Sequence, residues 1–385
     1  MAAVFWVSVA FVLYAYVGYP MLLAIWVRLR GYAASARQAR GFAASAQQGH
    51  GFAASARQVE RRGRDPLPGV SVVIAARNEA QRLPARIDNL LASDYPSDRL
   101  QIIVASDGST DDTASALAPY RDRVTLLMLP ARGKAAALNA AVLHARHPLL
   151  VFADARQRFA KDAIRRLVGA FTHPRVGAVS GELIIDCEHD SSASERSTIG
   201  EGVGAYWKYE KWIRRHEAIV GSSIGVTGAI YAMRRWLWQP LPADAILDDL
   251  LGPMRLVQRG YRVQFEPGAR AFDLAANDAA SELRRKVRTL AGNFQLLRYE
   301  PRFLVPGRNP VWLQFSSHKL ARLLVPYALL ALLVSSAFLV TTAAVYALAF
   351  TAQAAFYGLA AYGALLDRRA RVTPAPAVEV FREAA

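Results

Sequence analysis

Two acidic residues in the middle of the chain have the type and the position that chemistry on a nucleotide requires. Asp107 lies three residues after the apolar run Leu100–Val104, and Asp154 lies two residues after the run Pro148–Phe152. Side chains at the carboxyl ends of neighbouring parallel strands meet at the sheet edge where α/β proteins bind ligands. Together the two carboxylates could hold a nucleotide base and a divalent metal ion.

Both residues also have a structural interpretation. The carboxylate of Asp107 can accept a hydrogen bond from the imide of a uracil ring, but Asp-Gly-Ser-Thr is also ordinary turn chemistry. Asp154 could bind Mg²⁺ or Mn²⁺ bridging a diphosphate, because hard cations prefer carboxylate and phosphate oxygens. A single Asp is more often a helix cap, so these alternatives stay open.

A further acidic feature is the pair Asp248–Asp249, set between leucines. Adjacent like charges raise the pKa of at least one carboxyl group, and such a carboxylate could take the proton from an acceptor hydroxyl. The alternative is capping of the helix expected at Leu250–Arg259. Lys134, after Gly133 at a strand-to-helix junction, could bind a phosphate together with the helix amides, or it could be a solvated charge.

Short β-rich runs alternate with helical patterns around these residues. The expected strands are Val70–Ala76, Leu100–Val104, Val124–Leu129 and Leu149–Phe152. The expected helices are residues 83–91, 111–120, 134–145, 250–259 and 284–297. The alternation predicts an α/β fold with a Rossmann-like, mostly parallel sheet and crossover helices. The pattern loosens after Asp186, and residues 190–202 are expected to form a loop.

The composition favours a membrane over nucleic acid as the partner of this basic chain. The net charge is +16, but the Arg residues are scattered and gather beside apolar runs, and no nucleic-acid motif is present. The single cysteine, Cys187, allows no internal disulfide, which fits a reducing cytoplasm. His144 and His318 have no partner at metal-ligand spacing and are interpreted as structural or interfacial.

Two apolar regions are long enough to cross a membrane. Residues 1–27 carry no charged side chain and precede Arg28, and residues 323–366 carry none either, which suits a hairpin of two crossings. A cleaved signal peptide is the alternative for the first region, but a positive n-region is missing and the apolar core is too long. The basic flanks predict the amino terminus outside and both the middle domain and the carboxyl terminus in the cytoplasm.

Six segments are therefore expected along the chain. They are a transmembrane helix at 1–29, a low-complexity linker at 30–65, an α/β domain at 66–300, an interfacial helix at 301–322, a transmembrane hairpin at 323–366 and a cytoplasmic tail at 367–385. The linker contains three copies of a ten-residue unit that begin at Gly31, Gly41 and Gly51. It is either a passive duplication or a helix on the membrane surface.

An ordered set of motifs resembles the family 2 glycosyltransferases, specifically the membrane-bound inverting branch that includes cellulose, hyaluronan and poly-N-acetylglucosamine synthases. The resemblance covers about Pro68 to Leu297. Its motifs are Ser71–Glu79, Ser106–Asp111, Gly133–Asn139, Phe152–Ala155, Thr227–Ala229 and Asp248–Asp249. The family implies a GT-A fold, a UDP-sugar donor and a divalent cation, Mg²⁺ or Mn²⁺.

The resemblance also implies roles for individual residues on the donor side. Asp107 would contact the uracil, with Glu79 close to the nucleoside. Asp154 would be the first acid of the family's Asp-x-Asp motif and bind the metal ion and diphosphate. Lys134 would contribute to nucleotide-sugar binding, and Arg288 would hold the diphosphate.

On the acceptor side, the resemblance assigns the catalytic base. Asp249 matches the last acid of the Thr-Glu-Asp motif, with Asp248 beside it. Thr227 and Gly228 would border the bound acceptor.

The chain departs from the family pattern at three places. Ser106 stands where the family often has a first Asp, and Arg156 stands at the second acid of Asp-x-Asp, so that metal binding rests on fewer ligands. The Gln-x-x-Arg-Trp motif of processive synthases aligns with Arg285–Thr289, which keeps Arg288 but lacks the Gln and Trp. The missing aromatic face argues against processive polymerisation.

The sequence as a whole predicts an inverting glycosyltransferase of the inner (cell) membrane with a cytoplasmic catalytic domain. A UDP-sugar would be the donor, and a lipid-linked or cell-surface polysaccharide would be the acceptor. Membrane lipids and other envelope-assembly proteins are the expected partners, and nucleic acid is not. The alternatives are a processive polysaccharide synthase and an inactive sugar-nucleotide-binding scaffold.

Overall fold

The structure is a computed structural model that describes residues 1–30, 67–186, 198–274 and 279–372. The chain divides into two compact units, one comprising residues 1–18 and 320–385 and the other residues 19–319. The expected linker repeat lies outside the described residues, as does most of the loop expected at 190–202. The last residues of that loop are helical instead, because a long helix begins at Thr198.

The larger unit is built on an eight-stranded mixed sheet with the order β3-β2-β1-β4-β7-β6-β8-β5. The strands are β1 Val70–Ala76, β2 Leu100–Asp107, β3 Val124–Leu129, β4 Leu149–Ala153, β5 Arg158–Phe159, β6 Val176–Asp186, β7 Ile230–Arg234 and β8 Arg262–Leu274. Strands β1 to β4 pair in parallel, whereas β7 runs antiparallel to both of its neighbours. The carboxyl ends of the first four strands therefore lie at one edge.

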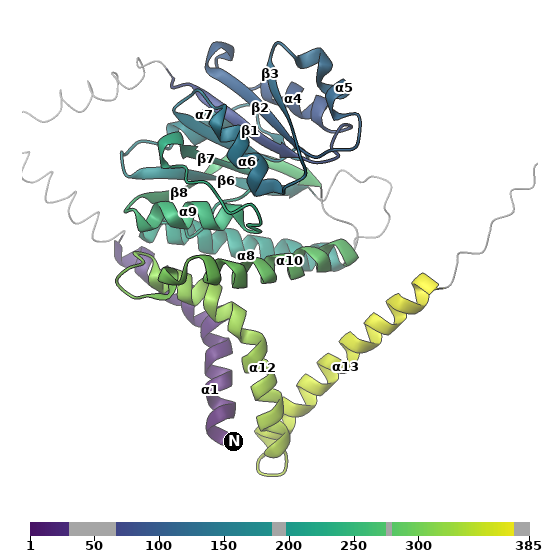
Figure 1. The fold of residues 1–385 in the computed structure, drawn as a ribbon. Coiled ribbons are helices and arrows are strands. Elements are labelled where there is room, and N and C mark those ends of the chain that lie inside the picture. Colours follow the sequence, from purple (N-terminus) through teal and green to yellow (C-terminus); the bar gives the residue numbers. More distant parts are fainter. Residues whose placement is uncertain (31–66, 187–197, 275–278, 373–385) are drawn as a thin grey trace, which may run out of the picture. The chain divides into compact units, whose positions relative to one another are not determined.

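Helices cover both faces of this sheet (Figure 1). They are α4 Leu83–Leu91, α5 Thr113–Leu117, α6 Lys134–Leu143, α7 Ala163–Gly169, α8 Thr198–Val220, α9 Asp248–Gln258 and α10 Ala279–Tyr299. The alternation of side chains along a strand sends successive residues of β1 to opposite faces. One face packs against α4 and α7, and the other packs against α6 and α9.

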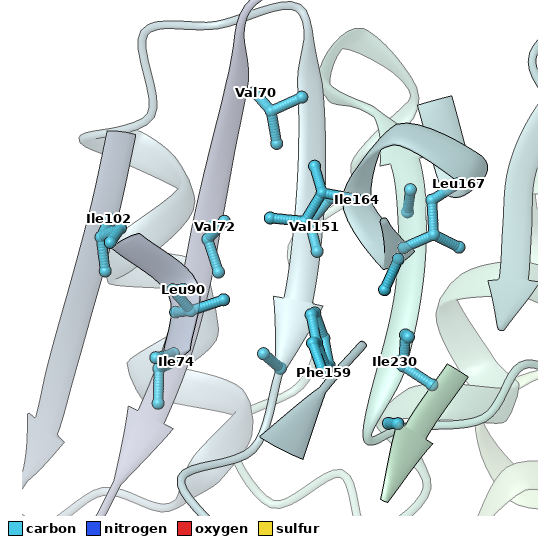
Figure 2. Packing of buried hydrophobic residues seen from close by; sticks show 14 of the residues in the cluster. Val70, Val72, Ile74, Leu90, Ile102, Val151, Phe159, Ile164, Leu167 and Ile230 are labelled. Atoms are coloured by element: carbon cyan, nitrogen blue, oxygen red, sulfur yellow. The ribbon is translucent and has the colours of Figure 1, made fainter. Parts of the chain in front are cut away.

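The first of these faces forms a continuous apolar core, shown in Figure 2. Val72 and Ile74 of β1 and Val151 of β4 lie beside Leu90 of α4 and Leu167 of α7. All five side chains are buried. The core fixes the strands whose ends carry the acidic residues.

The predicted strands in the first half of the domain are confirmed, and the α/β fold class with them. β2 is longer than expected, because it continues to Asp107 and so makes this residue part of the strand. Strands β6, β7 and β8 were not predicted. Their pairing is between distant segments, and the antiparallel β7 makes the sheet mixed.

Among the residues that the structure describes, three helices are long and apolar enough to cross a membrane. They comprise residues 2–30, 312–338 and 344–366. The first contains α1 Ala2–Leu13, the second contains α12 Ala321–Phe338, and the third lies in α13 Ala344–Val372. In the smaller unit, Ala15 packs with Ala321 and Val325 of α12. The second helix begins eleven residues before the hairpin expected from charge alone, since the residues from 312 onward are already helical.

We predict that Ile87→Ala destabilises the domain by about 2–5 kcal/mol, because Ile87 is fully buried between α4 and the sheet and its loss leaves a cavity. Thermal unfolding of the full chain in detergent measures the effect. The control is Leu143→Ala at the end of α6, where the side chain is 85% exposed and the expected change is at most about 0.5 kcal/mol. Equal shifts for the two variants would contradict this core.

Candidate active site

Two loops at the carboxyl ends of β1 and β2 are tied to each other by side-chain-to-backbone hydrogen bonds. The amide of Thr110 donates to Asn78 Oδ1 (2.8 Å), the amide of Asn78 donates to Ser109 Oγ (3.0 Å), and the amide of Ala80 donates to Asp111 Oδ2 (2.8 Å). Asn78 adopts a positive φ of 55°, a conformation that Asn tolerates better than most residues. The loops thus form one platform beside the sheet edge.

Asp111 is held ionised by this platform. Its carboxylate accepts hydrogen bonds from the Thr113 hydroxyl and from the Ala80 amide, and these bonds lower its pKa. The Asp111 carboxylate thus stabilises the loop backbone through the Ala80 amide.

The carboxylate of Asp107 organises the next loop, which leads into α6. Oδ1 accepts the amide protons of Arg132 (2.7 Å) and Gly133 (3.0 Å), and Oδ2 lies 3.0 Å from the same Gly133 nitrogen. Asp107 is 5% exposed. A carboxylate has about four lone-pair sites. A nucleobase could therefore donate only to the lone pairs of Asp107 that the two amides do not already use.

Lys134, the first residue of α6, brings two distant carboxylates together. Its Nζ lies 3.2 Å from Asp154 Oδ1, just after β4, and 3.4 Å from Asp248 Oδ2 at the start of α9. Burial alone would lower the pKa of Lys134, but Asp248, Asp154 and Asp249 outweigh burial and hold it above its usual value. The ammonium therefore stays charged at the centre of an acidic site.

Asp249 lies next to the segment predicted to border the acceptor. A methyl group at Gly228 would be 3.3 Å from both Cβ and Oδ2 of Asp249, so only glycine leaves this carboxylate unhindered. The amide of Val226 donates to the Asp249 carbonyl (3.0 Å). Asp248 and Asp249 form the first turn of α9 and provide no side-chain cap, so the capping interpretation does not apply.

Thr227 is held from two sides. Its amide donates to Ser180 Oγ of β6 at 2.8 Å, and Arg214 of α8 donates from Nη1 to its Oγ1 at 3.5 Å. The acceptor-side segment is thereby fixed to β6 and α8 as well as to α9.

The surroundings of Asp249 raise its pKa to about 6. Burial is the largest cause and the adjacent Asp248 carboxylate is the second, while Lys134, Arg214 and Lys319 act in the opposite direction. The group is ionised at neutral pH yet more basic than an ordinary carboxylate. These are the properties that a general base needs.

Arg156, which stands at the second acid of the family's Asp-x-Asp motif, pairs with an acidic residue of β8. Arg156 Nη2 lies 2.5 Å from Asp273 Oδ2 of β8, and Gln157 donates to the same oxygen at 2.9 Å. Within the described residues no group of three or more His, Cys, Asp or Glu side chains could hold a metal ion. The donor set fits a cation bound by Asp154 alone and completed by substrate phosphates and water, an arrangement usual for Mg²⁺.

Two predicted residues lie apart from this cluster. The Glu79 carboxylate, on the β1 loop, pairs with Arg82 at 2.7 Å. Arg288 lies on an exposed stretch of α10, and in the described part of the chain no hydrogen bond or ion pair joins it to another site residue.

Several residues that shape the site were not identified from the sequence. Ser180, Arg214 and Asp273 belong to the half of the domain where the sequence pattern loosens, and their partners are distant along the chain. Asn78 and Asp111 stand inside quoted motifs, but their hydrogen bonds to loop backbone depend on how β1 and β2 lie side by side. The only local signal for them was the turn-forming residue type.

The mixed sheet with helices on both faces is a GT-A fold. The solved structure of the mannosyltransferase PcManGT from Pyrobaculum calidifontis, in complex with GDP-Man and Mn²⁺, superimposes with a TM-score of 0.57 at 24% sequence identity, over 78% of this chain and 86% of that one. Residues 71–237 match the family described as Glycosyl transferase family 2. This match agrees with the family that the motifs predicted.

Curated relatives agree with this assignment. Poly-beta-1,6-N-acetyl-D-glucosamine synthase of Staphylococcus aureus is 26% identical over 243 residues, or 60% of this chain and 56% of the relative. The synthase of the same name from Staphylococcus epidermidis is 24% identical over 236 residues, or 60% and 55%. The chain thus matches little more than half the length of these relatives.

We predict that Gly108→Ala destabilises the site by about 1–3 kcal/mol, the usual cost of forced backbone strain. Gly108 has a φ of +61°, and an added Cβ would lie 2.5 Å from Ala131 Cβ and 2.6 Å from the Ala131 amide nitrogen. Thermal unfolding measures the loss. Gly169→Ala is the matched control, because nothing lies within 4 Å of its added Cβ; if both variants unfold alike, the close approach at Gly108 does not exist in solution.

Proposed function

We propose that the protein is a membrane-anchored inverting glycosyltransferase that moves a sugar from a UDP-sugar to a lipid-linked or cell-surface polysaccharide acceptor. The observation that carries the proposal is the position of Asp249. This carboxylate, with its pKa raised to about 6, stands beside a half-buried cation–carboxylate cluster on one side and the segment that contains Gly228 on the other. A base next to a phosphate-binding cation is what transfer from a nucleotide sugar requires.

The reaction follows from these groups. Asp249 accepts the proton of the acceptor hydroxyl, the hydroxyl oxygen attacks the anomeric carbon, and the bond between that carbon and the diphosphate oxygen breaks, so that UDP leaves with the electron pair. Attack opposite to the leaving group inverts the anomeric configuration. Lys134 lies close enough to the carboxylates to offer its charge to the diphosphate, since its ammonium is 3.2 Å from Asp154. Arg288 would need to approach from α10.

The donor end of the site is assigned to the platform of strand-end loops. Asp107 and Glu79 would face the nucleoside, as the family motifs imply, with Thr227 and Gly228 on the acceptor side. The rigid hydrogen bonds of Asn78 and Asp111 support this role, because a preformed loop binds a base at a smaller cost in entropy.

A divalent cation, Mg²⁺ or Mn²⁺, would be held by Asp154 together with the diphosphate. When bound, it would supply positive charge that stabilises the departing UDP. The structure of PcManGT contains Mn²⁺, which supports cation use in this fold. Because Asp154 would then exchange Lys134 for the cation, Lys134 would remain paired with Asp248.

The three apolar helices support a membrane location. The topology, with the amino terminus outside and the domain in the cytoplasm, and the domain boundaries given above remain predictions from charge and composition. Membrane lipids and other envelope-assembly proteins would be the partners of a domain at the inner face.

A processive polysaccharide synthase is the second candidate, and the name of the staphylococcal relatives favours it. Thr289 lacks the aromatic face that a sugar ring stacks on, which favours short products. Purified protein incubated with a panel of nucleotide sugars and extracted lipid acceptors decides the matter. Release of UDP with short products supports the proposal, long polymer formed while most acceptor is unextended supports the synthase, and no release with any pair supports an inactive scaffold.

We predict that Asp249→Asn lowers transfer by about 10²–10⁴-fold, as loss of a general base does, while UDP-sugar binding changes only a few-fold. In the wild type, kcat/KM should rise with pH through about 6, because the base must be ionised and its pKa is raised to that value. The pH profile and calorimetry measure both effects. A variant with half of the wild-type activity would remove Asp249 from this role.

We predict that Asp154→Ala raises the Mn²⁺ concentration needed for activity and weakens metal-dependent UDP binding, because Arg156 provides no second acid. Calorimetry of UDP with and without Mn²⁺ gives a readout independent of activity. Asp162→Ala serves as the control, since its carboxylate pairs with Arg166 on α7. Equal UDP affinity with and without metal, in wild type and Asp154→Ala alike, would refute the assignment.

A further inference from the structure

A buried polar cluster joins three segments that are distant in the sequence. His318 Nδ1 lies 2.9 Å from Glu217 Oε1, His318 Nε2 lies 3.1 Å from Glu210 Oε2, and the Tyr19 hydroxyl donates to Glu217 Oε1 at 2.7 Å. The four residues are each at most 5% exposed. We refer to Tyr19, Glu210, Glu217 and His318 as the His318 cluster.

Both ring nitrogens of His318 are used within this cluster, one toward each carboxyl group. Burial makes an unsatisfied polar group costly, so the imidazole and the two carboxyl groups stabilise one another, and the loss of any one weakens the position of the others.

The cluster lies on the same face of α8 as a residue of the active site. Glu210, Arg214 and Glu217 follow one another at spacings of four and three residues, which puts them on one side of the helix. Arg214 donates to Thr227 Oγ1. The next residue is Gly228, where an added Cβ would lie 3.3 Å from Oδ2 of Asp249. The position of α8 thus determines where the Arg214 charge lies relative to Asp249.

We propose that His318 is a positioning residue for the catalytic base: its imidazole ring, held between Glu210 and Glu217, fixes the face of α8 that presents Arg214 to Thr227 and Asp249. This proposal rests on the role of Asp249 given above. The charged groups that act on Asp249 are Asp248 from α9, Lys134 from α6, Arg214 from α8, and Lys319 next to His318. Arg214 depends on the cluster through α8, and Lys319 interacts with Glu210 and Glu217 of the cluster.

The test is the acid limb of the kcat/KM profile with saturating donor. His318→Gln keeps a polar side chain of similar size but lacks the two opposed ring nitrogens that contact Glu210 and Glu217. When Arg214 is released, Asp249 loses a cation that lowers its pKa, so the acid limb should move to higher pH by about half a unit or more. Arg214→Met should move it in the same direction, and the double variant should move it no further than the larger single shift.

Three comparisons make the result specific. His216→Gln changes a histidine on the same helix that stacks on Trp212 and lies outside the cluster, and it should leave the profile unchanged. UDP-sugar affinity within two-fold of the wild type shows that each variant is folded. If His318→Gln is not recovered folded, Tyr19→Phe removes one hydroxyl from the cluster and should give a smaller shift in the same direction.

The outcomes separate this proposal from the function it rests on. An unchanged acid limb in a folded His318→Gln or Tyr19→Phe protein overturns the positioning role while the base stands, and so does additivity of the His318→Gln and Arg214→Met shifts. A wild type without an acid limb that depends on Asp249 overturns the proposed function, and this inference with it.

Discussion

An ammonium group between two carboxylates determines how the centre of this domain is arranged. Lys134 begins α6, Asp154 follows β4 and Asp248 begins α9, and the contacts of 3.2 and 3.4 Å bring these three element ends to one point. Without the cation, Asp154, Asp248 and Asp249 would be three like charges in a partly buried place, which is unfavourable. The same balance keeps Lys134 charged and allows Asp249 a raised pKa.

The edge of the sheet that bears this cluster is shaped mainly by side chains that bind backbone. Asp107 accepts the amides that precede α6, and Asn78 and Asp111 join the loops after β1 and β2. These polar side chains are thus partly committed to the loops. These bonds make the loops around the site rigid, and functional sites need such rigidity to keep their geometry.

The Thr227 segment depends on contacts between distant parts of the chain. Thr227 is bound by Ser180 of β6 and by Arg214 of α8, and α8 is in turn bound by Tyr19 and His318. Tyr19 and His318, which lie in two of the apolar helices, are therefore connected, through buried polar contacts within the larger unit, to the segment beside Asp249. A change at these residues can reach Asp249 without touching it.

The sequence by itself determined the first half of the fold and the acidic residues of the site. Strands β1 to β4 are apolar runs, and Asp107 at the end of β2 and Asp154 just after β4 were expected at one edge because parallel strands end at the same edge. The ordered motifs could indicate a family because each motif is local. The apolar helices could likewise be recognised from composition alone.

Only the tertiary structure decided the rest. The antiparallel β7 and the partners β6 and β8 depend on pairing between distant segments, and so do the partners of Lys134, Thr227 and Asp249. His318 shows the difference most clearly: the sequence offered no partner for it, yet the fold encloses it between carboxylates 101 and 108 residues away. Hydrogen bonds and ion pairs act over a few ångströms in space, and a sequence pattern records neighbours only along the chain.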